Sequence, residues 1–98
     1  MAVSTLKKEF IVDTVTSSVG AYVVPKDSYL ADQSLDIAKS GWIPRGIVAY
    51  RKTGAASVYT VLSNYSLQGN VLKMDFRNTT SANDANITIT VWVLYERA

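Results

Sequence analysis

Hydrophobic and charged residues alternate strictly in one run near the end of the chain. Between residues 71 and 77, Leu72, Met74 and Phe76 alternate with the charged residues Lys73, Asp75 and Arg77. A period of two places successive side chains on opposite faces of a β-strand. The spacing therefore predicts a strand over residues 71–77, with its hydrophobic side chains in a core and its charges in water.

The last run, residues 87–96, shows the same period over a greater length. One face carries Ile, Val and Tyr at every position, whereas the other combines Thr and Glu with Trp92 and Leu94. Two large apolar residues on the second face indicate that this face is partly covered too. We expect Trp92 to pack on an opposing sheet or on a neighbouring subunit, and we expect a homo-oligomer with cyclic symmetry.

Five earlier runs are rich in Val, Ile and aromatic residues and are bounded by turn chemistry. The predicted strands cover residues 10–15, 18–24, 34–39, 46–52 and 56–64. Helical periodicity is poor throughout, so a single helical turn near residues 29–33 is the most that we expect. Residues 1–8 form a short lead.

Short strands at close spacing, without helical segments between them, are typical of two packed β-sheets. We therefore predict an all-β fold, an antiparallel, jelly-roll-like β-sandwich of about six to eight strands. The 98 residues suffice for one domain.

Composition removes most kinds of catalytic site. The chain has no Cys and no His, its eight Asp and Glu are scattered, and its five Gly are dispersed. Thiol or histidine chemistry, zinc sites and a Gly-rich phosphate loop are thereby excluded. The segment from Asn83 to Asn86 offers oxygen ligands, but it lacks the Gly and the bidentate Glu of a calcium loop. We predict no enzyme, no cofactor and no metal.

Charge and hydropathy limit the partners in the same way. The net charge is +2, and basic residues form no stripe. Nucleic-acid binding needs a concentrated basic face, and a membrane span needs about 20 apolar residues. We predict neither nucleic-acid binding nor membrane insertion.

Aromatic and polar residues are the better candidates for contacts. Large aromatic side chains fill cores and interfaces, and exposed ones can stack on a sugar. Loops carry ligand contacts more often than strands do, which singles out residues 52–56 and 78–86. The candidate ligand or interface residues are Trp42, Tyr50, Tyr59, Asn78, Asn83, Asp84 and Trp92.

Two segments resemble small tail-associated proteins of phages of Gram-positive bacteria. Residues 34–50 read SLDIAKSGWIPRGIVAY, and residues 77–95 pair an Arg-Asn-Thr-rich turn with a final Thr/Val strand that ends in Val-Leu-Tyr. Trp42 stands where the family pattern has Tyr. The resemblance implies a β-sandwich in a tail fibre, tail tip or baseplate, in some members the receptor-binding head, and it transfers no catalytic residue.

The resemblance also implies a place and partners. It suggests a virion protein made in the host cytoplasm, which contacts other tail proteins and serves in assembly or host attachment. Attachment would mean weak recognition of cell-wall saccharide, strengthened by the avidity of an oligomer. Two alternatives stay open, namely a capsid or tail scaffolding subunit without a ligand and a glycan-acting hydrolase accessory domain.

Overall fold

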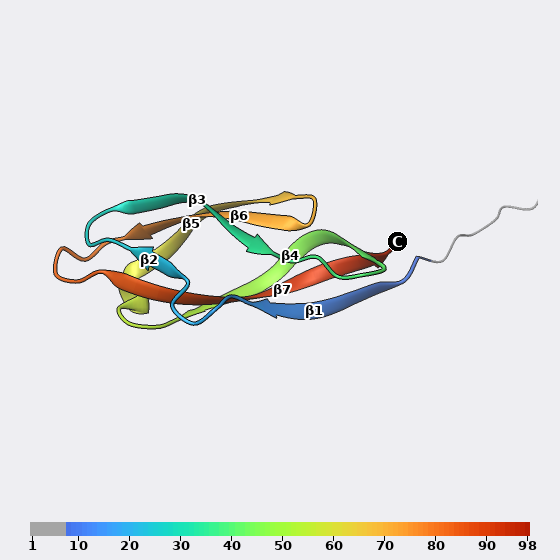
Figure 1. Cartoon of the computed structure of the whole chain (residues 1–98), viewed down its shortest axis with the longest axis horizontal. Helices are drawn as coiled ribbons and strands as arrows, with labels where there is room; N and C mark the ends of the chain where they lie inside the picture. The colour runs from blue at the N-terminus through green and yellow to red at the C-terminus, as the bar shows by residue number, and fades with distance from the viewer. Residues whose placement is uncertain (1–7) are drawn as a thin grey trace, which may run out of the picture.

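Seven β-strands form two antiparallel sheets that pack face to face, as the sequence predicts (Figure 1). The structure is a computed structural model and describes residues 8–98. The predicted lead lies almost wholly outside the described residues. The elements are β1 (Phe10–Thr16), β2 (Tyr22–Val24), β3 (Tyr29–Asp36), β4 (Trp42–Thr53), the 3-10 turn η1 (Ser57–Tyr59), β5 (Thr60–Gln68), β6 (Val71–Asn78) and β7 (Ala85–Arg97).

β7 is the central strand of the first sheet. β1 and β2 pair with successive parts of one of its edges, and β4 pairs with the other edge. The second sheet has the order β3-β6-β5. The chain changes sheet between β2 and β3, between β3 and β4, between β4 and β5, and between β6 and β7. No helix among the described residues is both long and apolar enough to cross a membrane.

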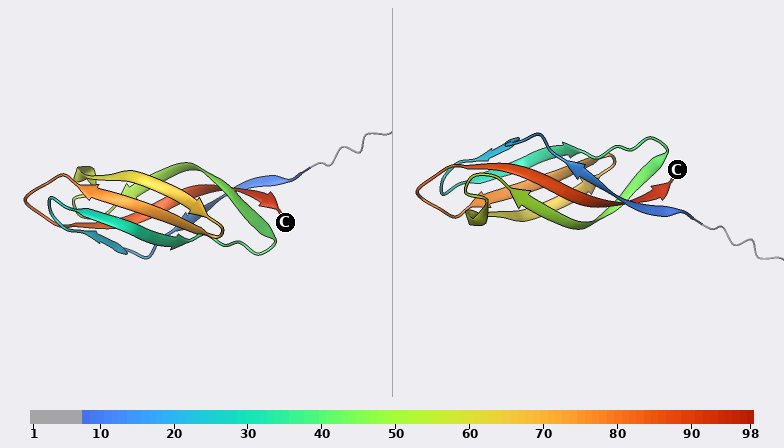
Figure 2. Two further views of the ribbon diagram at one scale, coloured as in Figure 1. Left: turned by 90° about the horizontal axis from the view of Figure 1, so that it is seen from above. Right: turned by 90° about the horizontal axis from the view of Figure 1, so that it is seen from below.

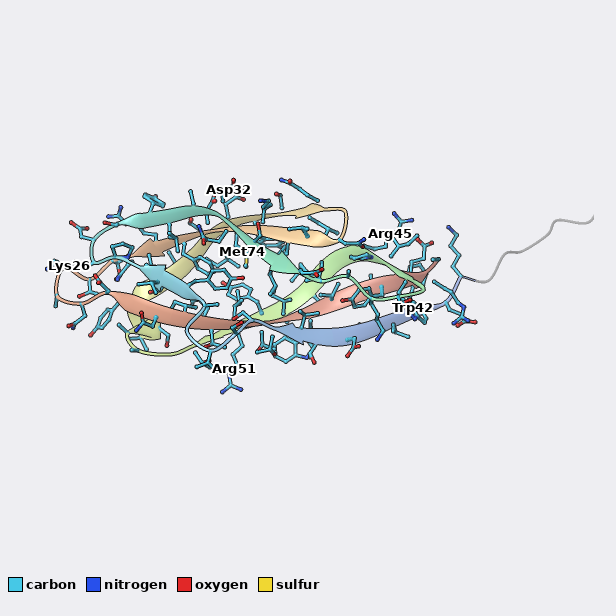
Figure 3. All side chains as sticks on the ribbon, in the orientation of Figure 1. Lys26, Asp32, Trp42, Arg45, Arg51 and Met74 are labelled. Carbon is cyan, nitrogen blue, oxygen red and sulfur yellow. The ribbon has the colours of Figure 1, made fainter. Side chains whose placement is uncertain are left out.

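The core lies between β6 and β7, where the alternation is strongest. The inner residues of β6 and β7, Met74 and Val91 among them, are at most 1% exposed. Tyr22 and Phe76 join the two sheets, with ring centroids 5.3 Å apart. Met74 lies between the layers (Figure 3). The predicted strands over residues 71–77 and 87–96 are confirmed, since burial follows their period of two.

Three local predictions are wrong. The predicted strand over 18–24 covers only β2, because residues 19–20 form a turn. Residues 29–33 form no helical turn but belong to β3, which a bulge interrupts at Asp32, with φ 58°. This bulge breaks the alternation that would have identified the strand. The predicted strand over 56–64 begins only at Thr60, because Gly54 (φ 121°) and Ala56 (φ 58°) turn the chain into η1.

β4 is an irregular edge strand. Its register shifts after Pro44 and again after Ile47. Pro cannot donate to a ladder and is tolerated at edges and bulges. Pro44 therefore lies at a bulge inside a strand.

The free edge of β1 carries an inward-facing charge. Asp13 of β1 lies directly opposite the core residue Val93 of β7. Both side chains therefore lie on the face of the sheet that is turned toward the second sheet. Lys39 Nζ lies 3.0 Å from Asp13 Oδ2. This hydrogen bond from Lys39 lowers the pKa of the Asp13 carboxyl. The charge is thus held beside an otherwise unpaired strand edge.

Two tyrosine hydroxyls of the first sheet donate hydrogen bonds to main-chain carbonyls in and just after β3 of the second sheet. Tyr95 donates to the Ile37 carbonyl at 2.7 Å, and Tyr22 donates to the Ser34 carbonyl at 2.8 Å. Burial raises the pKa of both phenols. These bonds fix the end of β3 against the first sheet.

Tyr95→Phe should lower the free energy of unfolding by about 1–3 kcal/mol, because it leaves the buried Ile37 carbonyl without a donor. Urea denaturation followed by circular dichroism measures the change. Tyr65→Phe, at a half-exposed ring on β5, is the control and should stay within about 0.5 kcal/mol of the wild type. Equal stabilities of the two variants would contradict this role of Tyr95.

Candidate binding surface

Three connections meet at one end of the sandwich, which we call the loop end. They are the turn at residues 25–28, η1 and the loop at residues 79–84 (Figure 2). Residue 8 and the C-terminus lie at the opposite end, where the Arg97 N–H donates to the Glu9 carbonyl. Lys26 marks the loop end, and Trp42 and Arg45 mark the other (Figure 3).

Asn78 is the buried anchor of the loop end. Its side chain is fully buried, and its Nδ2 donates to the carbonyls of Val24 (3.1 Å) and Asn83 (2.9 Å). Its Oδ1 accepts a hydrogen bond from the Thr80 N–H at 3.0 Å. The predicted contact residue Asn78 therefore shapes the surface from below and does not itself face a ligand.

Further hydrogen bonds link the three connections to one another. Asp84 Oδ1 accepts from the Lys26 N–H at 2.9 Å, and the Asp27 N–H donates to the Thr80 carbonyl at 2.7 Å. The N–H and the hydroxyl of Thr79 both donate to the Tyr59 carbonyl. Loops tied in this way present their side chains in a fixed arrangement.

A charged and aromatic cluster borders the loop end on the second sheet. Arg77 on β6 lies 4.9 Å from the ring centroid of Tyr29, its register partner on β3. The Arg77 guanidinium also lies 3.1 Å from Asp27 Oδ1. Tyr29 is 63% exposed despite this contact. An exposed ring, a cation and a carboxylate thus stand together.

η1 adds two exposed side chains at the same end, Val58 and Tyr59. Asn83 and Asp84 are exposed in the neighbouring loop. The structure therefore brings together Tyr59, Asn83 and Asp84 of the predicted residues, around the anchor Asn78. We call this group, with Asp27, Tyr29 and Arg77, the loop-end surface.

The other predicted residues lie elsewhere and apart. Trp42 is half-buried at the opposite end, 5.4 Å from the Arg97 guanidinium. Tyr50 pairs with core residue Val91, on the inner side of β4, whereas Trp92 pairs with Ala49 and Thr14 on the outer side of the sheet. Trp92 and Tyr50 therefore lie on opposite faces of the first sheet, and Trp92 does not pack on the second sheet as one of the two predictions had it.

The acidic residues of the described chain do not gather in groups. Asp75 Oδ1 accepts from the Asp32 N–H at 2.7 Å, and Lys73 Nζ lies 3.6 Å from the Asp32 carboxylate. Lys73 and Arg77, the neighbours of Asp75 on the same face of β6, thus pair with other carboxylates. Among residues 8–98 no three Asp or Glu side chains gather as metal ligands would, and no cavity is found.

Glu96 is the most enclosed carboxylate of the end opposite to the loops. It is 6% exposed and lies between Lys8 Nζ (2.7 Å) and Arg45 Nε (2.6 Å). The hydrogen bonds from Lys8 and then Arg45 hold the pKa of Glu96 below its ordinary value. This cluster ties the start of the described chain to β4 and β7.

Sequence reasoning missed Asp27, Tyr29 and Arg77 as one group. Arg77 was recognised as an outward charge, but residues 29–33 were assigned to a helical turn. The pairing of Tyr29 with Arg77 joins residues far apart in the chain. The one available signal was the alternation over residues 71–77. It places Arg77 on the exposed face of the strand, where a cross-strand partner for its charge could be expected.

Asn78→Asp should destabilise the protein by about 2–4 kcal/mol at pH 7, because a buried carboxylate would face two carbonyl oxygens. Burial should raise the pKa of this Asp in the folded state. The loss of stability relative to the wild type should therefore shrink toward zero below about pH 4, the pKa of an Asp in the unfolded chain. Urea denaturation of both proteins at each pH measures this loss. Asn70→Asp, at an exposed site in the turn between β5 and β6, should change stability by less than about 0.5 kcal/mol.

Glu96→Gln should make the stability of the protein depend less on pH in the acidic range. The lowered pKa of Glu96 means that its contribution is present above the ordinary value of 4.5 and is lost as pH falls toward the folded pKa. The variant should be less stable than wild type at pH 7, and the difference should narrow in acid. Thermal unfolding between neutral and acidic pH measures this, and parallel curves for the two proteins would refute it.

Comparisons with protein-family models, with curated proteins and with solved structures found no match. The fold is therefore assigned from its own strand pairing. The tail resemblance remains a prediction from residues 34–50 and 77–95.

Proposed function

We propose that this protein is a non-enzymatic, tail-associated protein of a phage or prophage, made in the host cytoplasm and built into the virion, where it attaches to the host surface. The resemblance of residues 34–50 and 77–95 supports the place in a tail. The observation that carries the attachment role is the loop-end surface, which combines exposed aromatic rings with polar groups on mutually bonded loops.

The chemistry of the loop-end surface suits a saccharide. Tyr29 and Tyr59 can stack on the C–H faces of sugar rings, since both rings are more than half exposed. Asp27, Asn83 and Arg77 offer acceptors and donors for sugar hydroxyls. Loops already bonded to each other lose little freedom on binding, which favours affinity.

The position of this surface supports the same role. The loop end lies opposite the described ends of the chain (Figure 2). Contacts to other tail proteins at the far end would leave the loop end open toward a cell wall. Each site would bind weakly, and several copies on one particle would supply avidity.

A ligand-free scaffolding subunit is the second candidate. The observation in its favour is the outer face of the first sheet, where Phe10 and Val12 are each more than half exposed. Such a face is typical of contact with another protein. The hydrolase alternative requires two carboxylates in one cleft, and no observation among the described residues favours it.

The test has two parts. Mass spectrometry of particles purified from the strain that encodes the protein should detect it in the virion. Purified full chain should sediment with cell walls from a panel of Gram-positive bacteria, and Tyr29→Ala should weaken this binding by about tenfold per site.

Tyr65→Ala is the matched control, because Tyr65 is a half-exposed tyrosine on β5 outside the loop-end surface. It should bind walls like the wild type. A protein present in particles that binds no wall would favour scaffolding, and absence from particles would contradict both tail roles.

A further inference from the structure

The outer face of the first sheet, turned away from the second sheet, is apolar toward the end opposite to the loops. Its side chains stand in rows across β1, β7 and β4, because residues paired directly across antiparallel strands share one face. Successive rows place Phe10 and Ile43 beside Glu96, Val12 beside Leu94, and Ala49 beside Trp92. We call the apolar residues of these rows the outer patch.

The outer patch is open to water in the single chain. Phe10 is 53% and Val12 52% exposed, and Trp92 and Leu94 are partly exposed. Exposed apolar side chains that adjoin one another cost free energy in water and mark contact surfaces. The outer face of the second sheet, by contrast, carries paired charges of β6, Lys73 among them. The outer patch is therefore a surface for a partner.

Basic residues stand at both ends of the outer patch. At one end, Lys8 Nζ (2.7 Å) and Arg45 Nε (2.6 Å) both bind the enclosed carboxylate of Glu96. One cation balances one carboxylate, so this group keeps an excess positive charge. At the other end, Arg51 stands in the row of Thr90, is exposed and points away from the second sheet (Figure 3). Within residues 8–98 it forms no ion pair.

Both arginines keep hydrogen-bond donors for a ligand. Arg45 uses Nε for Glu96, and its terminal nitrogens donate to no acceptor within the described part of the chain. Its side chain is 50% exposed. A guanidinium with free N–H groups can bind a carboxylate through two parallel hydrogen bonds. The outer patch thus lies between two groups that suit the carboxylates of a partner.

The outer patch has the size of one helix. Rows two residues apart are separated by roughly 7 Å and neighbouring strands by roughly 5 Å, so the patch measures about 20 Å by 14 Å. A stable interface between folded proteins takes about 800 Å² on each side, which is far more. A helix is about 10–12 Å wide and spans 20 Å in about four turns. It also satisfies its own backbone hydrogen bonds, which a strand laid on the face of a sheet cannot do.

We propose that the outer patch binds one amphipathic helix of another tail protein, whose apolar stripe has Asp or Glu at both ends. The stripe covers Val12, Trp92 and Leu94, and the carboxylates bind Arg45 and Arg51. The proposal deepens the proposed function and rests on it, because it names the contact that holds this protein in the tail. The loop-end surface stays free.

Charge and size select this occupant. Two copies of the face would bring their excess positive charges together, and residues 8–98 contain no α-helix that one copy could offer to another. A polyanion such as a nucleic acid needs a concentrated basic face, whereas here the basic groups stand apart around an apolar centre. An apolar stripe between acidic residues is complementary to the centre and to both ends.

Two synthetic peptides test the chemistry of the outer patch. Each is an amphipathic helix of about 15 residues with one stripe of Leu. The first has Glu at both ends of the stripe, and the second has Lys at the same places. Fluorescence anisotropy of the labelled peptide, titrated with the full chain, measures binding. The Glu peptide should bind at least about tenfold more tightly than the Lys peptide, and added salt should reduce this difference.

Arg51→Glu should weaken the binding of the Glu peptide at least about fivefold and strengthen that of the Lys peptide, because it reverses the charge at one end of the patch. Lys52→Glu is the matched control. It makes the same change of net charge at the next residue, which pairs with core residue Ile89 on the inner side of β4. It should leave both affinities within about twofold of the wild type, and circular dichroism checks that each variant keeps its fold.

Several results would overturn the proposal. They are equal binding of the two peptides, binding of neither, or an Arg51→Glu variant that binds both like the wild type. Vesicles of phosphatidylglycerol that displace the Glu peptide would assign the patch to an anionic membrane instead. Self-association of the wild type that Val12→Lys abolishes would assign it to a second copy.

A cross-link in purified particles tests the partner itself. The chain has no Cys, so Val12→Cys supplies one thiol, at an exposed position of the outer patch, for a maleimide photo-cross-linker. Mass spectrometry should place the cross-link in a helical segment of a different virion protein, with Asp or Glu beside apolar residues. A cross-link to a second copy, or to a segment without acidic residues, would contradict the proposal.

The two experiments keep this proposal separate from the proposed function. Absence of the protein from particles would contradict the tail role, while a preference for the Glu peptide that depends on Arg51 would still support the chemistry of the outer patch. A protein present in particles that shows no such preference would overturn the helix-binding proposal alone.

Discussion

The burial of β7 is the constraint on which the rest of the structure depends. Its inward side chains, Ile87 to Tyr95 at every second position, are at most 1% exposed. A strand buried on that face requires an opposing sheet, which β3, β6 and β5 provide. Its two edges require partners as well, and β1, β2 and β4 supply them. Once β7 is covered on three sides, only its outer face remains to be accounted for.

The sequence predicted the parts of the fold that are set by local alternation. Residues 71–77 and 87–96 were assigned correctly because each side chain keeps one environment along the strand. The bulge at Asp32 interrupts that alternation, so the first part of β3, residues 29–33, was not recognised as a strand. Val58 and Tyr59 are strand-forming types in composition, yet the positive φ of Ala56 places them in a turn. Composition cannot reveal where the backbone bends.

The residues of the candidate site also differ in whether local pattern or non-local pairing decides their place. Tyr59, Asn83 and Asp84 meet because loops at one end of a sandwich are neighbours whatever their order in the chain. Trp42 and Trp92 separate because their places depend on register with a distant strand. The grouping of Tyr29 with Arg77 arises only from the pairing of β3 with β6. Non-local pairing therefore decided which aromatic residues share a surface.

The ion pair on the edge of β1 has a consequence for how this sheet could be extended. A foreign strand laid along this edge would have to strip water from Asp13 and Lys39 or separate them. Lengthening the sheet sideways by addition of a strand at this edge, the route to endless fibres, is thereby discouraged.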